Sequence, residues 1–228
     1  PNKTPKAIFI STFSTAPLAP EYEWVLKGQG ALLQAAIDRL SAVAPVYAGI
    51  RAGAAATEFR GLKNCTLFEV AGPHPAGNPS VQINHVLPMA KGDTVWTIDI
   101  QSLALIGRLF VRGVVDMQRK VALTGPLAYG RQYYNVLPGM PVSAILASNT
   151  YAGVSCRYIA GDVLSGHQVG INETFSICDN QYTVIDEGTE NHEFMGWLLP
   201  RCNSFQFGYT DPAKMCDNAF TRWLFGPK

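Results

Sequence analysis

The segment of residues 71–78, Ala-Gly-Pro-His-Pro-Ala-Gly-Asn, constrains the fold more than any other part of the sequence. It follows a short apolar run, 66–70, that is typical of a β-strand, and it precedes a run from Ser80 that is typical of a helix. Its two glycines permit a close approach of the backbone, and its two prolines stiffen the loop. A strand that passes through such a loop into a helix is the unit from which α/β folds build ligand crevices.

The first half of the chain alternates strand and helix patterns. Apolar residues recur at helical spacing over 33–44, and Pro45 ends that helix. Asp99 holds the N-cap position of a later helix, and Gly113 lies just past its end. We expect strands at residues 7–12, 46–50, 66–70, 95–98 and 121–125. Strands separated by helices predict a mostly parallel sheet with right-handed crossovers, that is, an α/β domain over residues 1–124.

The second half has a different pattern. Residues 132–136 and 155–159 are strand-like, and Pro141 can begin a short helix that ends near residue 148. Residues 175–178 and 181–185 flank Asp179-Asn180, which predicts a two-residue hairpin. A hairpin, one helix and further strands are the order of a β-grasp unit. We therefore expect an α+β domain of the β-grasp type, with a carboxyl-terminal extension, over residues 125–228.

Composition excludes several classes of protein. The net charge of +1 gives no electrostatic argument for nucleic acid. The longest apolar stretch, 103–111, is interrupted by Arg108 and is too short to cross a bilayer. The chain begins at Pro1 with no signal-peptide pattern, so we interpret it as a fragment of a cytoplasmic protein. Charged residues make up only 15%, which indicates either a merely neutral surface or a surface partly covered by something else.

Metal and catalytic motifs are missing from the sequence. The five cysteines have no C-x-x-C spacing, which argues against a disulfide framework, a zinc site and an iron–sulfur cluster. The acidic cluster at 186–193 is more typical of a solvated loop than of a cation site. Residues 28–33 approach a dinucleotide fingerprint, but Leu33 stands where the third glycine belongs. We expect no metal site and no catalytic residues.

Three polar side chains at predicted strand ends are candidate ligand contacts. His74 can hydrogen-bond a ligand carbonyl such as a quinone oxygen, or it can simply brace the loop. Asn78 has the same two interpretations, with helix capping favoured. Asp99 can meet a ribose or a protonated quinol, although capping of the following helix explains it as well and is favoured.

Several blocks of sequence, taken in order, resemble one family. They are residues 71–78, 93–99, 106–110, 121–126, 161–166 and 193–200. Together they closely resemble the middle of the A subunit of the bacterial sodium-translocating NADH:quinone reductases, and they span nearly all of the chain.

The resemblance implies a peripheral protein on the cytoplasmic side of the inner membrane. In that family the complex passes electrons from NADH to ubiquinone and exports sodium, with its flavins and iron–sulfur cluster in other subunits. The partners implied are the other subunits, including integral membrane ones, and ubiquinone. This chain is expected to bind no cofactor of its own and to be inactive in isolation. The family's amino-terminal domain and carboxyl-terminal helical region are expected to be absent.

The resemblance also implies a fold and a site. The family is similar to the flavin-bearing subunit of respiratory complex I, in which a Rossmann-like domain precedes a soluble-ligand-binding β-grasp domain. The quinone-binding role attributed to the A subunit is assigned here, as a hypothesis, to five residues. They are Gly72, His74, Gly77, Asn78 and Asp99.

Two other functions stay open. A scaffold that docks on membrane subunits and binds no ligand agrees equally well with the low charge content and the absent cofactor motifs. A free-standing nucleotide-dependent oxidoreductase is the least favoured, because the fingerprint at 28–33 is incomplete.

Overall fold

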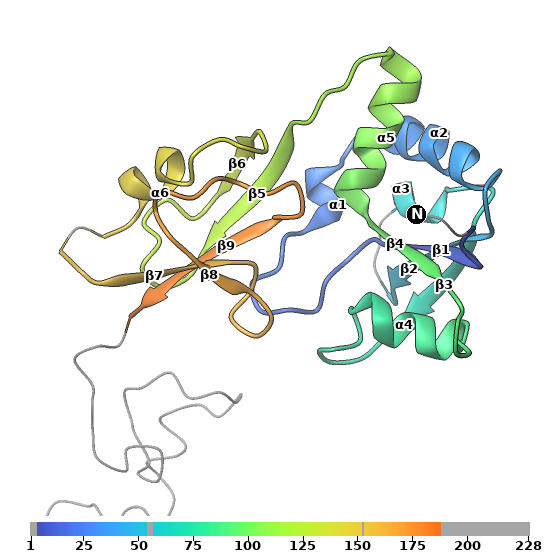
Figure 1. The fold of residues 1–228 in the computed structure, drawn as a ribbon, viewed down its shortest axis with the longest axis horizontal. Coiled ribbons are helices and arrows are strands. Elements are labelled where there is room, and N and C mark those ends of the chain that lie inside the picture. Colours follow the sequence, from blue (N-terminus) through green and yellow to red (C-terminus); the bar gives the residue numbers. More distant parts are fainter. Residues whose placement is uncertain (1–3, 54–56, 152, 188–228) are drawn as a thin grey trace, which may run out of the picture. The chain divides into compact units, whose positions relative to one another are not determined.

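The computed structural model describes residues 4–53, 57–151 and 153–187, all of which belong to one compact unit, Pro1–Glu187 (Figure 1). The resemblance block at 193–200, most of the acidic cluster at 186–193, and Cys202 and Cys216 lie outside the described residues. The described part contains two sheets, one parallel and one mixed.

The first sheet is parallel throughout. Its strands are β1 (Ala7–Ser11), β2 (Val46–Arg51), β3 (Thr66–Val70) and β4 (Val95–Asp99), in the spatial order β3-β2-β1-β4. All four lie where the sequence predicts them. The chain moves outward from β1 to β3 and then returns to the other side of β1, so the strand order reverses between β1 and β4.

Helices cover both faces of this sheet. They are α1 (Tyr22–Val25), α2 (Gly30–Leu40), α3 (Thr57–Arg60), α4 (Pro79–Val86) and α5 (Ile100–Arg112). Alternate side chains of β1 explain the arrangement, because Ile8 and Ile10 join the core beneath α2 and α5. Ala7 and Phe9 point the other way and pack with Ile83 of α4. Figure 1 shows α4 on the opposite side of the sheet from α2 and α5. The α/β interpretation of the first half is confirmed.

The ends of α5 follow the sequence signals. The Asp99 carboxylate accepts a hydrogen bond from the Ser102 backbone N–H at 3.1 Å, as an N-cap should. Gly113 adopts a left-handed conformation with φ of 71° at the other end. The capping role predicted for Asp99 is therefore confirmed.

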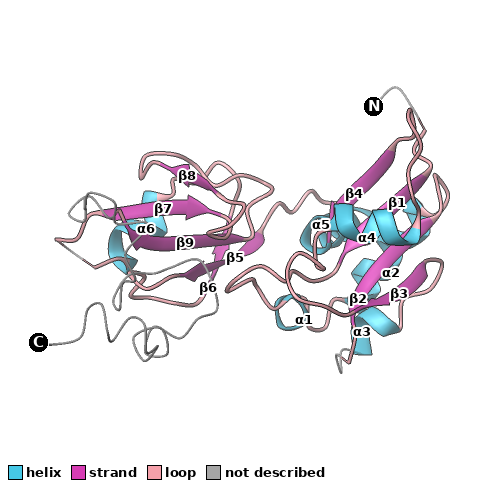
Figure 2. Ribbon diagram, turned by 90° about the horizontal axis from the view of Figure 1, so that it is seen from below, coloured by secondary structure: helices cyan, strands magenta, loops and turns pink. Residues whose placement is uncertain are grey.

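The second sheet is mixed (Figure 2). It contains β5 (Arg119–Thr124), β6 (Tyr133–Val136), β7 (Cys156–Ala160), β8 (His167–Val169) and β9 (Gln181–Asp186), in the order β6-β5-β9-β7-β8. Only the β5–β9 pair is parallel. Buried residues of these strands pack with Leu146 of α6 (Ser143–Asn149) in a separate core.

The structure corrects the assignment of the strand at 121–125. The sequence places it last in the parallel sheet, whereas β5 pairs with β6 and β9 in the second sheet. Close packing at the end of β5 explains the difference. A Cβ on Gly125 would lie only 2.2 Å from the Val184 carbonyl oxygen, so the backbone there rests directly on β9.

The predicted hairpin around Asp179-Asn180 is wrong. Residues 175–178 form no strand, and β9 pairs with β5 and β7 instead. The Phe175 N–H donates to the Met140 carbonyl, which ties this segment to the chain before α6. The Asn180 side chain instead accepts a hydrogen bond from Arg119. The short strand β8 was not predicted, because its first two residues are polar and exposed.

A hydrogen-bond network centres on the buried side chain of Arg119, the first residue of β5. Its Nη2 donates to Asp99 Oδ2 and to Asn180 Oδ1, each at 2.8 Å, and its Nη1 donates to Ser102 Oγ at 3.1 Å. The Arg119 side chain is 0% exposed, whereas that of Asp99 is 31% exposed. The network therefore joins the end of β4, the first turn of α5, the start of β5 and the residue before β9.

Removing the carboxylate should destabilise the protein strongly. The Asp99→Ala substitution leaves a buried guanidinium without its counter-charge, so we expect the free energy of unfolding to fall by about 3–5 kcal/mol. Chemical denaturation followed by circular dichroism measures the change. The exposed pair of Lys6 and Asp93, 2.7 Å apart, is the control, and Lys6→Ala should change stability by about 0–1 kcal/mol. Equal effects of the two substitutions would contradict a central role for Arg119.

Candidate functional site

The carboxyl ends of the four parallel strands meet at one edge of the first sheet. The loop after β1, Arg51 of β2, the loop at 71–78 after β3, and Asp99 of β4 all lie at this edge. In open α/β sheets the ligand crevice lies outside such ends, where the strand order reverses. This edge is therefore the first place to test the predicted site.

Thr15, in the loop after β1, holds the loop at 71–78 in place. Its Oγ1 accepts a hydrogen bond from the Gly77 N–H at 2.9 Å and lies 3.2 Å from Nδ1 of His74. Because the hydroxyl already accepts from Gly77, it can donate its own proton to Nδ1. That arrangement leaves the proton of a neutral ring on Nε2, which has no partner among the described residues.

The other predicted residues of this loop have distinct roles. Gly72 is exposed with φ of +144°, a conformation that side chains rarely adopt. Gly77 is buried, and a Cβ on it would lie 2.6 Å from the Thr15 backbone nitrogen. Asn78 occupies the N-cap position of α4, but its side chain makes no capping hydrogen bond. The side-chain capping favoured for Asn78 is therefore not found, and its half-buried amide is not used by the helix.

The structure does not bring Asp99 together with the 71–78 loop. β3 and β4 are the two edge strands of the sheet, with β2 and β1 between them. Both oxygens of Asp99 are already engaged, by Ser102 and Arg119. Burial raises the pKa of the neighbouring Tyr22 hydroxyl, and the charge of Asp99 adds to the rise while Arg119 opposes it.

Sequence reasoning missed two residues at this edge, Thr15 and Arg51. Nη2 of Arg51 donates to the Ser14 carbonyl at 2.9 Å, and its guanidinium lies 5.4 Å from the centre of the Phe13 ring. The nearby Glu23 has a raised pKa because of burial and the charge of Glu21, although Arg51 opposes the rise. The only signal in the sequence was a strand that ends in a loop rich in hydroxyl residues, 11–15.

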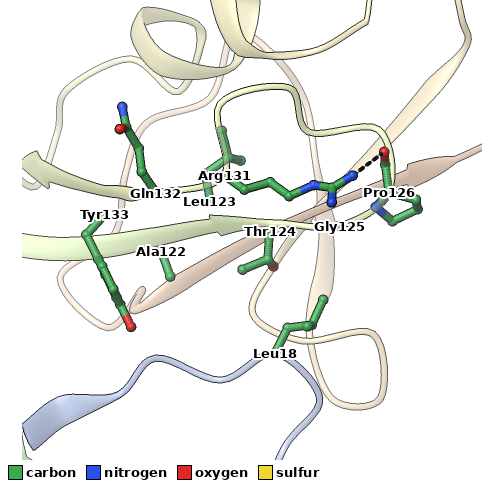
Figure 3. Close-up of a pocket in the computed structure, with 9 residues that line it drawn as sticks. All are labelled: Leu18, Ala122, Leu123, Thr124, Gly125, Pro126, Arg131, Gln132 and Tyr133. Carbon is green, nitrogen blue, oxygen red and sulfur yellow. Dashed lines mark hydrogen bonds between the residues drawn. The ribbon is translucent and has the colours of Figure 1, made fainter. Parts of the chain in front are cut away.

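A pocket of about 460 Å³ lies at the carboxyl end of β5 (Figure 3). Residues from three separate parts of the chain line it: Leu18, Ala122, Leu123, Thr124, Gly125, Pro126, Arg131, Gln132 and Tyr133. Leu18 belongs to the same loop as Thr15. Because the lining joins segments about a hundred residues apart, no local pattern in the sequence could have indicated the pocket.

The amino-terminal end of α2 carries the incomplete dinucleotide fingerprint. Gly28 has φ of +78°, and its N–H donates to Glu58 Oε1 at 2.7 Å. Helix amino-termini favour anions, and here the chain's own carboxylate takes that place. A dinucleotide phosphate at this position would meet the negative charge of Glu58.

Two absences hold for the described residues. No group of three or more His, Cys, Asp or Glu side chains in residues 4–53, 57–151 and 153–187 is arranged to hold a metal ion. Within the same residues, no helix has both the length and the apolar character that a membrane span requires.

Comparison with known proteins identifies the family. The family model described as the NqrA second alpha/beta domain matches residues 1–115, and the one described as the NQRA C-terminal domain matches residues 120–170. The chain belongs to the NqrA family, the A subunits of Na(+)-translocating NADH-quinone reductases. The resemblance found from the sequence blocks is confirmed.

Curated NqrA proteins cover most of this chain. The protein of Pasteurella multocida (strain Pm70) is 30% identical over 210 residues, which are 91% of this chain and 46% of that protein. The protein of Serratia proteamaculans (strain 568) is 32% identical over 213 residues, or 92% of this chain and 47% of that protein. The chain therefore spans about half the length of the NqrA relatives it matches.

Solved structures with a similar fold include an NAD+-reducing [NiFe]-hydrogenase. In its air-oxidized state the TM-score is 0.56 at 12% identity, covering 82% of this chain and 41% of the hydrogenase chain. The H2-reduced state gives a TM-score of 0.53 at 10% identity, covering 81% and 41%. At such low identity the likeness concerns the fold alone.

Gly77 should be intolerant of any side chain. Because a Cβ there would meet the Thr15 backbone at 2.6 Å, we expect Gly77→Ala to lower the free energy of unfolding by about 1–3 kcal/mol. Gly30→Ala is the matched control, since its nearest neighbour would be a Glu58 oxygen at 3.8 Å. That control should leave stability unchanged or raised by up to about 1 kcal/mol. Thermal and urea unfolding curves measure both, and an unaltered stability of the Gly77→Ala protein would refute the close packing of the two loops.

Proposed function

We propose that this chain is the quinone-contacting part of the NqrA subunit in a sodium-pumping NADH:ubiquinone reductase. It would act as a peripheral component on the cytoplasmic side of the membrane, together with the other subunits of the complex. Membership of the NqrA family supports this proposal, because the relatives are named as subunits of a quinone reductase.

The geometry of His74 is the observation that carries the quinone role. Its ring is fixed at the carboxyl edge of the parallel sheet, with Nδ1 bound by Thr15. Nε2 is then the donor available to a ring carbonyl of a quinone. The amide of Asn78, four residues later, can supply a second hydrogen bond. Gly72 leaves the backbone open to the ligand, and Gly77 lets the loop pack on Thr15.

Asp99 contributes to this function from a distance. Its carboxylate is engaged by Ser102 and Arg119, so a ligand would have to displace those partners. We assign Asp99 the role of fixing the start of α5 rather than that of touching the quinone.

The proposal includes a division of labour within the complex. The Glu58 carboxylate at the amino-terminus of α2 argues against nucleotide binding at that helix end. We therefore propose that NADH oxidation, the flavins and the iron–sulfur cluster reside in other subunits. We keep the proposal of a Rossmann-like part followed by a β-grasp part, with the predicted boundary at 124/125 moved to precede β5, because β5 pairs with β6 and β9.

Quinone titration tests the role of the loop. The 228-residue chain, labelled for amide NMR, would be titrated with ubiquinone-1, and saturable shifts are expected at residues 71–78. The double substitution His74→Ala and Asn78→Ala removes two hydrogen bonds, each worth about 1 kcal/mol, so affinity should fall about tenfold or more.

His85→Ala provides the control, because His85 is an exposed residue at the far end of α4 and should not affect affinity. Unchanged quinone affinity in the double variant would overturn the assignment of His74 and Asn78. Absence of any saturable shift in the unaltered chain would overturn the quinone-contacting role itself.

A second candidate function, docking without a ligand, is favoured by the end of α5. Leu109, Phe110, Val111, Val114 and Val115 all expose apolar side chains there, and Val115 is 71% exposed. These five exposed side chains lie within residues 109–115, and large exposed apolar patches mark interaction sites in many proteins. This surface would bind another member of the complex.

Polar substitution separates docking from ligand binding. Val114→Ser with Val115→Ser should change stability by no more than about 0.5 kcal/mol, because both side chains are exposed. The same variant, introduced into the full-length protein, should co-purify with the other subunits several-fold less than the unaltered protein. Leu164→Ser, an exposed position after β7, should leave co-purification intact. Equal recovery of all three proteins would argue against docking through this surface.

A further inference from the structure

The pocket at the end of β5 has the size of a small-molecule site. Its volume of about 460 Å³ falls within the roughly 300–1,000 Å³ typical of ligand pockets. It lies apart from the residues assigned to the quinone role, because none of Gly72, His74, Gly77, Asn78 and Asp99 lines it. Its possible ligand therefore has to be inferred from its own lining residues.

The walls of the pocket are apolar and include an aromatic ring. In Figure 3 the side chains of Ala122, Thr124 and Tyr133 extend from β5 and β6 toward Leu18. The Tyr133 ring is held in place, since it stacks on Trp24 with centroids 4.9 Å apart and its hydroxyl accepts from the Glu21 N–H at 2.9 Å. A flat apolar group can lie along such a wall.

Leu18 faces that wall in an unusual conformation. Its φ of 55° is rare for a residue with a branched side chain, and the side chain is 63% exposed. The neighbouring Pro17 carbonyl accepts a hydrogen bond from Gln181 Nε2 at 3.2 Å, which fixes the loop against β9. Backbone held in a sparsely populated region is a frequent mark of ligand sites.

Arg131 gives the pocket one polar end. Its Nε donates to the Ala128 carbonyl and its Nη2 to the Pro126 carbonyl, each at 3.1 Å. No carboxylate of the described residues pairs with it. Figure 3 shows the other terminal nitrogen turned toward Gly125, away from the Pro126 carbonyl. Within the described part of the chain, this exposed guanidinium has no carboxylate partner, and its Nη1 donates to no protein group and faces solvent.

The floor of the pocket cannot supply an acceptor for Nη1 of Arg131. The Thr124 hydroxyl is engaged by Tyr182, Thr183 and Gln181 at 3.2–3.3 Å. Gly125 offers no side chain, and a Cβ there would collide with the Val184 backbone, so the hollow beside Arg131 is built into the fold. Because Arg131 is exposed, solvent hydrates its free nitrogen, and the oxygen of a bound molecule can replace that water.

We propose that this pocket binds a flat aromatic or quinonoid ring that carries an oxygen acceptor. The ring lies between Leu18 and the Tyr133 side of the sheet, and the oxygen accepts a hydrogen bond from Arg131. A ring carbonyl of a quinone and the carboxylate of an aromatic acid share this chemistry. A dinucleotide does not fit it, because its two phosphates would share a single guanidinium.

Titration of the full 228-residue chain with two probes tests the pocket. Ubiquinone-1 carries the ring carbonyl and 4-hydroxybenzoate the aromatic carboxylate, and amide NMR shifts locate each one. Saturable shifts at Leu18, residues 122–126 and residues 131–133 support the pocket for whichever probe produces them. Shifts confined to residues 71–78, or none at the solubility limit of either probe, overturn it.

Two substitutions connect binding to the proposed contacts. Arg131→Gln removes the charge and should weaken binding about tenfold or more, and Leu18→Ala removes the opposite wall and should weaken it several-fold. Arg112→Gln and Leu164→Ala, an exposed arginine and an exposed leucine outside the pocket, should leave affinity unchanged.

The outcomes separate this pocket from the quinone role of His74. Unchanged affinity in both Arg131→Gln and Leu18→Ala overturns the pocket, whether or not the His74 and Asn78 variant weakens quinone binding. Displacement of both probes by inorganic phosphate at equal concentration also overturns it, because the site would then select an oxyanion rather than a ring.

Discussion

The buried guanidinium of Arg119 is the interaction on which the described structure depends. A charge with no exposure is tolerated only when hydrogen bonds and a counter-charge surround it. Asp99, Ser102 and Asn180 supply these, and they come from the end of β4, the first turn of α5 and the segment before β9. Because one carboxylate both caps α5 and neutralises Arg119, the two sheets are joined at a point that neither could satisfy alone.

The same junction helps to order the loop after β1, whose Thr15 contacts His74 and whose Leu18 lines the pocket. Gln101 extends the network by exchanging hydrogen bonds with the backbone of Lys120, at 2.8 and 2.9 Å. The ammonium of Lys120 lies 5.0 Å from the centre of the Trp24 ring, which in turn stacks on Tyr133. Because Trp24 belongs to α1, these contacts fix the end of the β1–α1 loop that leads into α1. Thr15 and Leu18, which precede α1, therefore hold defined positions against the 71–78 loop and the pocket.

Local pattern was enough to predict much of the fold. All four strands of the parallel sheet and both caps of α5 were recognised, because each apolar run has turn or capping residues beside it. Strand partners depend instead on distant contacts. The place of β5 depends on Val184, and the loss of the 175–178 hairpin depends on Met140. Arg119 was overlooked because an arginine is usually exposed, and its partners are 17, 20 and 61 residues away.

The location of the site was likewise predicted from local pattern, and its detailed contacts were not. The glycine–proline loop is a local signal, and it does lie at the carboxyl edge of the sheet. The contact of this loop with Thr15, 59 residues from His74, could not be foreseen. The ion pair of Asp99 with Arg119, which adds to its role as a helix cap, could not be foreseen either. A polar residue at a strand end is thus a good guide to where a crevice lies and a poor guide to which groups remain free for a ligand.

The amino-terminus of α2 shows why the shared fold does not carry a shared ligand. The hydrogenase chain and this one have similar folds, and a helix amino-terminus in such folds is a ready anion site. In this chain Glu58 places its own carboxylate at that position, as acceptor for the Gly28 N–H. The Glu58 carboxylate thereby already interacts with the positive end of the helix dipole. A phosphate would gain little there and would be repelled by the like charge. Ligand binding in this protein is then expected where a donor nitrogen has no protein acceptor among the described residues and can reach a ligand. Two such donors are Nε2 of His74, beside Thr15, and Nη1 of Arg131, beside Leu18.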